Sequence, residues 1–458
     1  MVNCSEIIFI LVTRTLECIF VLLEYSVDEV SKLYNVFCKA YNTSDNSSSN
    51  NTPKTVVIVG GSFAGLAALQ ELAFGESSNI RIVVIDQKNF FEYTPGVLRL
   101  FCDPSQFLTS LGREFDANRY TKNVMFLHGE VTAIHSDTNG LSYIPYNETT
   151  TMNLQYDYLI YAAGSTHTYP ITASSDERTL LSREEGWIVA NCKVKSSQKI
   201  VILGAGAVGT ELAAEIIDYF PNKEVTLIDA SPIVVPLFPK STQEYAQRWL
   251  QKKGVRLLLG KSLDKWDDKS CQFKDGTILQ ADAVYVCFGG KPNSKPASTQ
   301  NKSMFTMNGR KSLLVDQYLS CSNNTNIFSC GDVAYPPTEA LAQGFHAEIQ
   351  GIVAAKNVLA TIHSSISINN RMTRYPHDIC KSSRMPLVYV LSLGKYDGVL
   401  GFNNITIPGS IAAIFKWILE YTKVLQMEGK LLGRLIWKFG DAAALFLSRT
   451  IVRPPPMP

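Results

Sequence analysis

The sequence lacks three features that would each place a protein in a defined class: closely paired cysteines, an excess of one charge and a long uncharged apolar run. Its ten cysteines are scattered, with no C-x-x-C pair and no metal-like cluster, which indicates a reducing compartment and predicts no metal site. The formal net charge is only +2 over 458 residues. A nucleic-acid surface needs a clustered basic excess, so we expect no nucleic-acid partner.

The most apolar stretch, residues 7–25, is interrupted near its middle by Arg14 and Glu17. A membrane-spanning helix needs about 20 residues with few or no charges, so this stretch is a marginal candidate. Three interpretations stay open: a membrane anchor, a helix packed on the body of the protein, or a targeting signal. Residues 42–52 are polar and of low complexity, which predicts a disordered linker after this stretch.

Two glycine-rich loops are the most informative features that the sequence does contain. The first lies in TVVIVGGSFAGLAALQEL, from residue 55 to 72, and the second in KIVILGAGAVGTELAAEI, from residue 199 to 216. In each, an apolar strand runs into glycines spaced for a tight turn, close approach of backbone to a pyrophosphate, and helix packing. The following helix N-terminus offers unpaired N–H groups and a positive dipole end. The two loops together predict two dinucleotide sites.

An acidic residue ends the second strand of each of these units. Asp86 follows Gly65 by 21 residues and Asp229 follows Gly209 by 20, near the spacing of about 20 expected for a carboxylate that binds a ribose. Ser62 stands where the first loop would usually carry its middle glycine. Because serine is small, we expect close phosphate approach to survive this departure.

Three later apolar strands run into small residues, in segments 156–165, 278–293 and 326–334. Such strand ends let backbone pass close to a ligand. Their order predicts an α/β fold in which the second dinucleotide unit is inserted within the first. Beyond residue 371 the pattern changes to short strand-like runs and then to amphipathic helices.

These motifs, in this order, resemble the flavoproteins with two dinucleotide-binding domains, in which FAD occupies the outer domain and NAD(P)H the inserted one. The segments FPNKEVTLI, LSLGKYDGV and GRLIWKF are similar to the apoptosis-inducing-factor-like, ferroptosis-suppressor type of NAD(P)H:quinone reductase. Type II NADH dehydrogenases share the core. The resemblance covers residues 53–446. It implies two Rossmann-like domains, the NAD(P)H domain inserted in the FAD domain, plus a smaller C-terminal α+β domain.

The resemblance also implies domain bounds and cofactor contacts. The expected domains are an N-terminal segment with its linker (1–52), the FAD domain in two parts (53–165 and 297–370), the NAD(P)H domain (166–296), and a C-terminal domain with amphipathic membrane-association helices (371–458). The implied FAD contacts are Gly60, Gly61, Ser62, Phe63, Ala64, Gly65, Asp86, Ala163, Gly164 and Asp332, with Asp86 on the adenosine ribose and Asp332 on the ribityl chain. The implied nicotinamide-cofactor contacts are Gly204, Gly206, Gly209 and Asp229.

Two residues are implied to lie nearest the chemistry. Glu211 would approach the nicotinamide end, although a solvated carboxylate at a helix start is the alternative. His346 falls on the helix that passes under the flavin toward the quinone, and a packed histidine is its alternative. Thr338 stands where animal ferroptosis suppressors carry a lysine near the flavin. A carboxylate at Asp229 binds a free 2′-hydroxyl and repels a 2′-phosphate, which predicts NADH as the preferred donor, with NADPH as the alternative.

The region beyond residue 410 predicts a surface for the membrane in which a quinone resides. Lys430, Arg434 and Lys438 recur every four residues among apolar and aromatic side chains, as in a basic amphipathic helix. Docking on the protein body or a homodimer face are the alternatives. Val2 follows the initiator methionine, so the glycine needed for myristoylation is absent. We expect a cytoplasmic, membrane-associated protein, on the mitochondrial outer surface, a lipid droplet or another organelle membrane.

The predicted function is transfer of a hydride from NADH to FAD and of electrons from FAD to a quinone. A glutathione-reductase type of relay requires a close cysteine pair, and the corresponding stretch, NFFEYTPGVLRLFCDP, holds only Cys102. Reduced FAD must then pass electrons directly to its acceptor. Two alternatives stay open: an acceptor such as oxygen or a small redox protein, and an NAD(P)H-binding redox sensor that changes partners.

Overall fold

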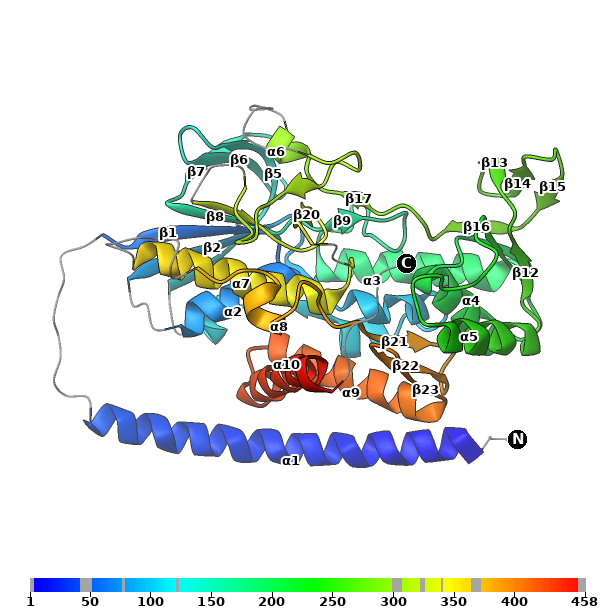
Figure 1. Ribbon diagram of the computed structural model, residues 1–458, viewed down its shortest axis with the longest axis horizontal. Coiled ribbons are helices and arrows are strands. Elements are labelled where there is room, and N and C mark those ends of the chain that lie inside the picture. The colour runs from blue at the N-terminus through cyan, green and yellow to red at the C-terminus, as the bar shows by residue number, and fades with distance from the viewer. Residues whose placement is uncertain are drawn as a thin grey trace.

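The computed structural model describes residues 4–41, 52–75, 79–120, 123–298, 307–321, 326–338, 341–363 and 372–451. The predicted linker lies outside these ranges except for residue 52. The predicted α/β fold is confirmed, with a large parallel-rich sheet, a smaller parallel sheet and a helical C-terminal region (Figure 1).

The larger sheet carries the first glycine-rich loop. Its first five strands are parallel and its last two join antiparallel. The inner strands are continuously apolar because both faces are covered, and Val56, Val57 and Ile58 are fully buried. In spatial order the strands are β19 (Ile327–Ser329), β8 (Tyr158–Tyr161), β1 (Lys54–Val59), β2 (Ile80–Asp86), β5 (Asn123–His135), β6 (Gly140–Pro145) and β7 (Met152–Gln155). Helices α2 (Phe63–Phe74) and α7 (Gly344–Ile362) pack together against it.

The inserted unit repeats this plan on a smaller scale. Its four strands are all parallel, in the order β12 (Arg256–Leu259), β11 (Glu224–Asp229), β10 (Lys199–Leu203) and β16 (Ala283–Val286). Its helices are α3 (Leu180–Ser196), α4 (Ala207–Tyr219) and α5 (Lys240–Lys252), and a meander of β13 (Leu263–Trp266), β14 (Ser270–Phe273) and β15 (Ile278–Gln280) extends from it. The chain enters and leaves this unit along two short antiparallel strands, β9 (Ser165–Thr166) and β17 (Lys291–Pro292).

The C-terminal region lies beside both units. It comprises α8 (His377–Cys380), the antiparallel strands β21 (Val388–Ser392), β22 (Gly398–Phe402) and β23 (Ile405–Pro408), and the helices α9 (Ser410–Met427) and α10 (Leu431–Thr450). The remaining short elements are β3 (Phe90–Glu92), η1 (Thr94–Phe101), η2 (Phe107–Leu111), β4 (Gly112–Glu114), η3 (Ala117–Arg119), α6 (Lys295–Ser298), β18 (Leu313–Leu314) and β20 (Ala334–Tyr335).

The apolar N-terminal stretch forms one long helix, α1 (Cys4–Tyr41), which runs along the outside of the C-terminal helices (Figure 1). Of its three sequence interpretations, packing on the body is what the structure contains. Phe9 packs edge-on against Tyr396 at 5.2 Å, and Phe20 stacks on Tyr421 at 5.4 Å. Within the described residues, no helix has a stretch long and apolar enough to cross a membrane.

The two predicted C-terminal helices are present, but their basic residues do not form a free stripe. Lys423 is 1 % exposed and pairs with Glu348 of α7. Lys430 pairs with Glu24 of α1, and the guanidinium of Arg434 lies 3.8 Å from the centroid of the Phe74 ring. Helical spacing had indicated that Lys430, Arg434 and Lys438 share a face; the first two contact the protein, whereas Lys438 is exposed. Membrane association of these helices stays a prediction.

Candidate functional site

The two glycine-rich loops have nearly the same backbone geometry. Gly60 and Gly204 follow β1 and β10 with φ of 105° and 103°, a conformation that favours glycine. The third glycine of each motif packs directly under the first: a Cβ on Gly65 or Gly209 would fall 1.8 Å from the carbonyl oxygen of Gly60 or Gly204. These third glycines lie in the first turns of α2 and α4. Each loop is thus a tight backbone cradle at the start of its helix.

The acidic residue of each unit holds its own loop. Asp86 Oδ2 accepts a hydrogen bond from the Gly61 amide at 2.6 Å, and Asp229 Oδ2 accepts one from the Ala205 amide at 2.5 Å. In both, Oδ1 accepts from the amide two residues further on, at 2.8 and 2.7 Å. The predicted acids therefore lie at the loops, as their spacing indicated. Their carboxylates also fix loop backbone, which the spacing did not reveal.

The middle positions of the loops, Ser62 and Gly206, are the residues before α2 and α4, and the Ser62 side chain makes no capping hydrogen bond. Beyond Ser62, the ring of Phe63 packs against Phe91 at 5.5 Å. Ala64 meets α7 so closely that a Cβ on Gly351 would lie 2.1 Å from its carbonyl oxygen. The start of α2 is therefore locked to α7.

Small residues from separate segments close around the first loop. Ser165 Oγ donates to Asp332 at 2.8 Å, which brings the end of β8 to the segment after β19. Asn293, at the exit of the inserted unit, donates its side-chain amide to the Ala163 carbonyl and its backbone amide to the Gly164 carbonyl. The predicted residues Ala163, Gly164 and Asp332 thus come together, and Asn293 joins them as a residue that the sequence did not single out.

The start of α7 presents buried polar atoms that have no hydrogen-bond partner in the described part of the chain: Thr338 Oγ1, Gln343 Oε1 and His346 Nδ1. His346 is 3 % exposed, and its Nε2 donates to the Pro386 carbonyl, since a carbonyl can only accept. Burial lowers the pKa of His346, opposed by the carbonyls of Pro386 and Leu341. The imidazole is therefore neutral, and Nδ1 is an open acceptor.

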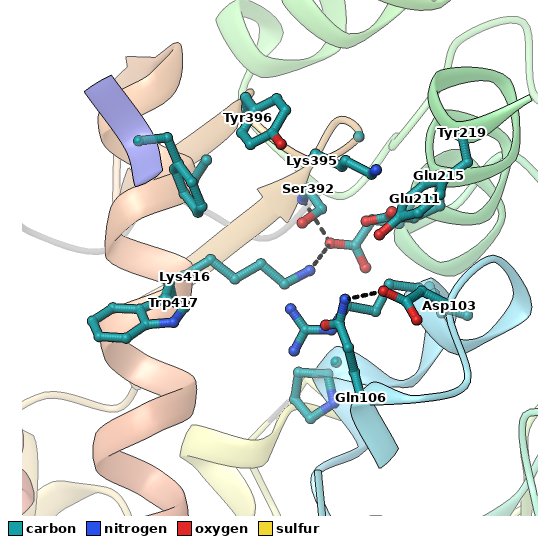
Figure 2. A pocket seen from close by; sticks show the side chains of 17 residues that line it. Asp103, Gln106, Glu211, Glu215, Tyr219, Ser392, Lys395, Tyr396, Lys416 and Trp417 are labelled. Atoms are coloured by element: carbon teal, nitrogen blue, oxygen red, sulfur yellow. Dashed lines mark hydrogen bonds and ion pairs between the residues drawn. The ribbon is translucent and has the colours of Figure 1, made fainter. Parts of the chain in front are cut away.

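A cavity of about 290 Å³ lies where η1, α4, the strand β21 and α9 meet (Figure 2). Glu211 enters it from α4, just beyond the first turn, and its Oε1 accepts from the Ser392 amide at 2.6 Å and from Lys416 Nζ at 3.1 Å. Its side chain is 12 % exposed, so the alternative of a solvated helix-start carboxylate does not hold. Sequence analysis missed both of these partners because they lie in the C-terminal region.

One turn further along α4, Glu215 faces the same cavity (Figure 2). Burial raises its pKa to about 7, although Lys416 and Arg99 act against this. Arg99 itself pairs with Glu420 of α9. Glu211 therefore shares the cavity with a second carboxyl group, Glu215, and with the cations Arg99 and Lys416. Aromatic side chains from Phe9 of α1 and Trp417 of α9 complete its wall.

These residues fit the two dinucleotides that the motifs predict. In both loops the third glycine has no room for a Cβ, and both loops lead into helix N-termini, where backbone amides can bind a phosphate. Near the first cradle, the unpartnered atoms of Thr338, Gln343 and His346 are of the kind that a heteroaromatic ring with carbonyl and amide edges satisfies. The fold and this arrangement define a dinucleotide-dependent oxidoreductase.

The chain belongs to the pyridine nucleotide-disulphide oxidoreductase family, whose model matches residues 54–363. It is 31% identical to ferroptosis suppressor protein 1 of Xenopus tropicalis over 366 residues, which cover 76% of this chain and 88% of the relative. The resemblance indicated by the sequence motifs is thereby confirmed. The protein is an NAD(P)H-dependent flavoprotein oxidoreductase, and its cofactors are FAD and NAD(P)H.

Solved structures share the fold. The sulfide:quinone oxidoreductase of Aquifex aeolicus matches with a TM-score of 0.68 at 16% identity, over 88% of this chain and 96% of the other. NDH2 of Plasmodium falciparum in complex with NADH matches with a TM-score of 0.64 at 13% identity, over 88% and 99%. At these identities the likeness concerns the architecture alone, and it extends to the C-terminal region.

Proposed function

We propose that the protein is an NADH:quinone oxidoreductase that works at a membrane surface. The observation that favours a quinone as acceptor is that Cys102 is the single cysteine of the stretch NFFEYTPGVLRLFCDP. It lies directly after η1 as a free, buried thiol. Burial raises its pKa far above the ordinary range, so the thiol stays protonated and unreactive. A dithiol relay needs two reactive cysteines at this place. A bound flavin would then have to be oxidised directly by its acceptor, and a quinone meets that requirement.

The donor side is built by α4 and its loop. Gly204, Gly206 and Gly209 hold the pyrophosphate of NADH, and Asp229 accepts from the 2′-hydroxyl of its adenosine ribose. Glu211 Oε1 is occupied by Ser392 and Lys416. Within the described residues Oε2 has no such partner, and it orients the carboxamide of the nicotinamide. Holding the nicotinamide ring in the reactive orientation lowers the entropic part of the barrier to hydride transfer.

On the flavin side, the loop from Gly60 to Gly65 with Phe63 and Ala64 holds the FAD pyrophosphate, Asp86 the ribose, and Asp332 with Ala163 and Gly164 the ribityl chain. When bound, FAD accepts the hydride and releases its electrons to the acceptor. Thr338 Oγ1 supplies a donor and His346 Nδ1 an acceptor at the start of α7. The Thr338 hydroxyl would donate to a carbonyl of the flavin ring or of a quinone beside it, and His346 Nδ1 would accept from a ring N–H.

The experiment is an anaerobic titration of the purified yellow protein with NADH, followed by a short-chain ubiquinone analogue. We expect one equivalent of NADH to bleach the flavin and one equivalent of quinone to restore it, faster than air-saturated buffer does. Equal or faster recovery with oxygen would replace the quinone by oxygen as acceptor. Flavin that is reduced but is restored by neither would indicate the sensor.

A pair of variants tests the donor side. Glu211→Gln should slow flavin reduction by NADH by about tenfold or more, since a neutral amide loses the Lys416 pair and the orientation of the carboxylate. Glu244→Gln, on the outer side of α5 with a half-exposed carboxylate, is the matched control and should leave the rate unchanged. Equal rates in the two variants would remove Glu211 from the mechanism.

A further inference from the structure

The outward face of α1 is apolar and uncovered. Ile8, Leu11, Ile19 and Leu22 are 44 to 67 % exposed. They are spaced 3, 8 and 3 residues apart, and 11 residues complete about three helical turns, so all four lie on one face. The apolar area of this face remains in contact with water, which is unfavourable in free energy. Something of matching chemistry is expected to cover it.

The opposite face of α1 is tied to the protein from residue 6 to residue 24. Near the N-terminal end, Glu6 accepts from the Tyr396 hydroxyl at 3.0 Å, and Phe9 packs on the same ring. Further along, Phe20 stacks on Tyr421 and Glu24 pairs with Lys430. The helix is thereby held lengthwise against α9 and α10 (Figure 1). The opposite, outer face of the helix therefore points away from the protein.

The composition of this face separates lipid from protein as its occupant. Protein interfaces depend on aromatic and arginine anchors within a polar, hydrogen-bonding rim. Here the aromatic residues Phe9 and Phe20 point inward, and the outward face consists of aliphatic side chains with the small Thr15, Cys18 and Ser26 between them. The exposed Tyr25 and Arg14 lie at the border of this face. Side chains with an apolar body and a polar tip suit the boundary between acyl chains and headgroups.

The area of the face argues in the same direction. From residue 7 to residue 25 the helix is about 28 Å long and about 10 Å wide, or roughly 280 Å² in projection. A stable protein interface buries about 800 Å² on each partner. A helix that lies in a lipid interface has no such threshold, because its apolar face sinks about 5–10 Å into the acyl boundary. Arg14 is 77 % exposed, and its long side chain can reach the headgroups.

We propose that α1 lies flat in a phospholipid surface, with Ile8, Leu11, Ile19 and Leu22 in the acyl boundary. The inference rests on the proposed function in one respect: a quinone acceptor resides in that bilayer. The inner face of α1 also contributes to the site, because Phe9 forms part of the wall of the cavity beside Glu211. Lipid on one side of the helix and the cavity on the other place the site within one helix diameter of the membrane.

The chain carries its own reporters for this test. Cys18 is exposed on the outward face of α1, and Cys192 is exposed on α3, away from α1 (Figure 1). The full-length holoprotein is prepared with one of these two cysteines retained and with the other, together with Cys4 and Cys38, replaced by serine. Each protein is labelled with an environment-sensitive fluorophore and mixed with phosphatidylcholine vesicles containing anionic phosphatidylserine. The Cys18 label should shift to the blue and become shielded from an aqueous quencher, and the Cys192 label should do neither.

Substitutions provide the second arm. Leu11→Glu with Leu22→Glu should weaken vesicle partitioning by about tenfold or more for each leucine, since each loses its apolar transfer and gains a charge. Leu181→Glu on α3, where the leucine is 66 % exposed, is the matched control and should leave partitioning unchanged. Reduction of a short-chain soluble quinone should be the same in all variants. Reduction of a long-chain quinone within the vesicles should fall only in the α1 variant.

The outcomes separate the two proposals. An unshifted Cys18 label, or vesicle binding unaffected by the α1 substitutions, overturns the lipid assignment. A vesicle-independent dimer that these substitutions dissociate overturns it in favour of a second copy. If the α1 variant loses vesicles while the wild type reduces no quinone of either kind, the lipid assignment holds and the proposed function fails.

Discussion

Replacing Lys423 by methionine tests the contact that joins the C-terminal helices to α7. The ammonium lies 2.5 Å from Glu348 Oε1 and 2.7 Å from Gln426 Oε1, and 3.2 Å from the centroid of the Trp437 ring. These contacts are buried, since the side chain of Lys423 is 1 % exposed and that of Glu348 is 4 % exposed. Methionine retains the apolar stem at similar length, so the substitution removes charge and leaves volume nearly unchanged.

The magnitude follows from the burial of the partner. Breaking a buried ion pair from one side costs about 3–5 kcal/mol, because the remaining charge is left uncompensated. Burial already raises the pKa of Glu348, and Lys423 is the group that lowers it. Without Lys423, the carboxylate takes up a proton more readily, which limits the loss. We therefore expect the lower end, about 3 kcal/mol, or a fall of about 6 °C in the unfolding temperature.

Thermal unfolding followed by circular dichroism at one scan rate provides the measurement, since a flavoprotein of this size unfolds irreversibly. Lys438→Met, at an exposed position of α10, is the matched control and should shift the midpoint by about 1 °C or less. The double variant Lys423→Met, Glu348→Met should recover most of the loss, because a buried pair replaced by apolar residues of similar volume is often neutral. A single variant as stable as the control, or a double variant no better than the single one, would refute the reasoning.

Three further predictions concern the cofactors and pH. Gly65→Ala should yield a protein with little flavin, whereas Gly209→Ala should keep its flavin and raise KM for NADH, since each Cβ collides with its own loop; the flavin-to-protein absorbance ratio and steady-state kinetics distinguish them. The wild type should prefer NADH over NADPH by at least about tenfold in kcat/KM because of Asp229, and equal values would contradict this. Burial, with Glu348 nearby, raises the pKa of Asp441 from 3.8 to about 7. A raised folded-state pKa favours folding at low pH and loses that effect as the pH rises through about 7, so Asp441→Asn should be more stable than wild type at pH 8 by about 2–4 kcal/mol and equal to it at pH 4. Parallel pH profiles of the two proteins would contradict this assignment.

The sequence was most informative where local chemistry dictates the conformation. The two loops and the positions of Asp86 and Asp229 were predictable because a tight strand-to-helix turn admits only glycine at certain places. The insertion of the second unit was predictable from the order of the strands that end in small residues. These features depend on neighbours in the chain or on a repeated supersecondary unit.

Pairings between distant segments could not be predicted. Lys416 reaches Glu211 from 205 positions away, and helical spacing gave no indication of that contact. Lys430 and Arg434 were expected on a lipid-facing stripe because periodicity shows which residues share a face, but it does not show what the face contacts. The same limit applied to α1: Arg14 and Glu17, near the middle of its apolar stretch, argued against spanning but did not locate the helix along α9 and α10.

The hydrogen bonds from loop amides to Asp86 and Asp229 carry a lesson for cofactor engineering. Exchanging the acid at the end of the second strand is the usual route to accept a phosphorylated ribose. In this chain, removing the Asp229 carboxylate also leaves the Ala205 amide without its acceptor. A variant with altered donor choice will therefore need a new acceptor for that amide, and screens that vary position 229 alone should recover weaker binding of both coenzymes before they recover a change of preference.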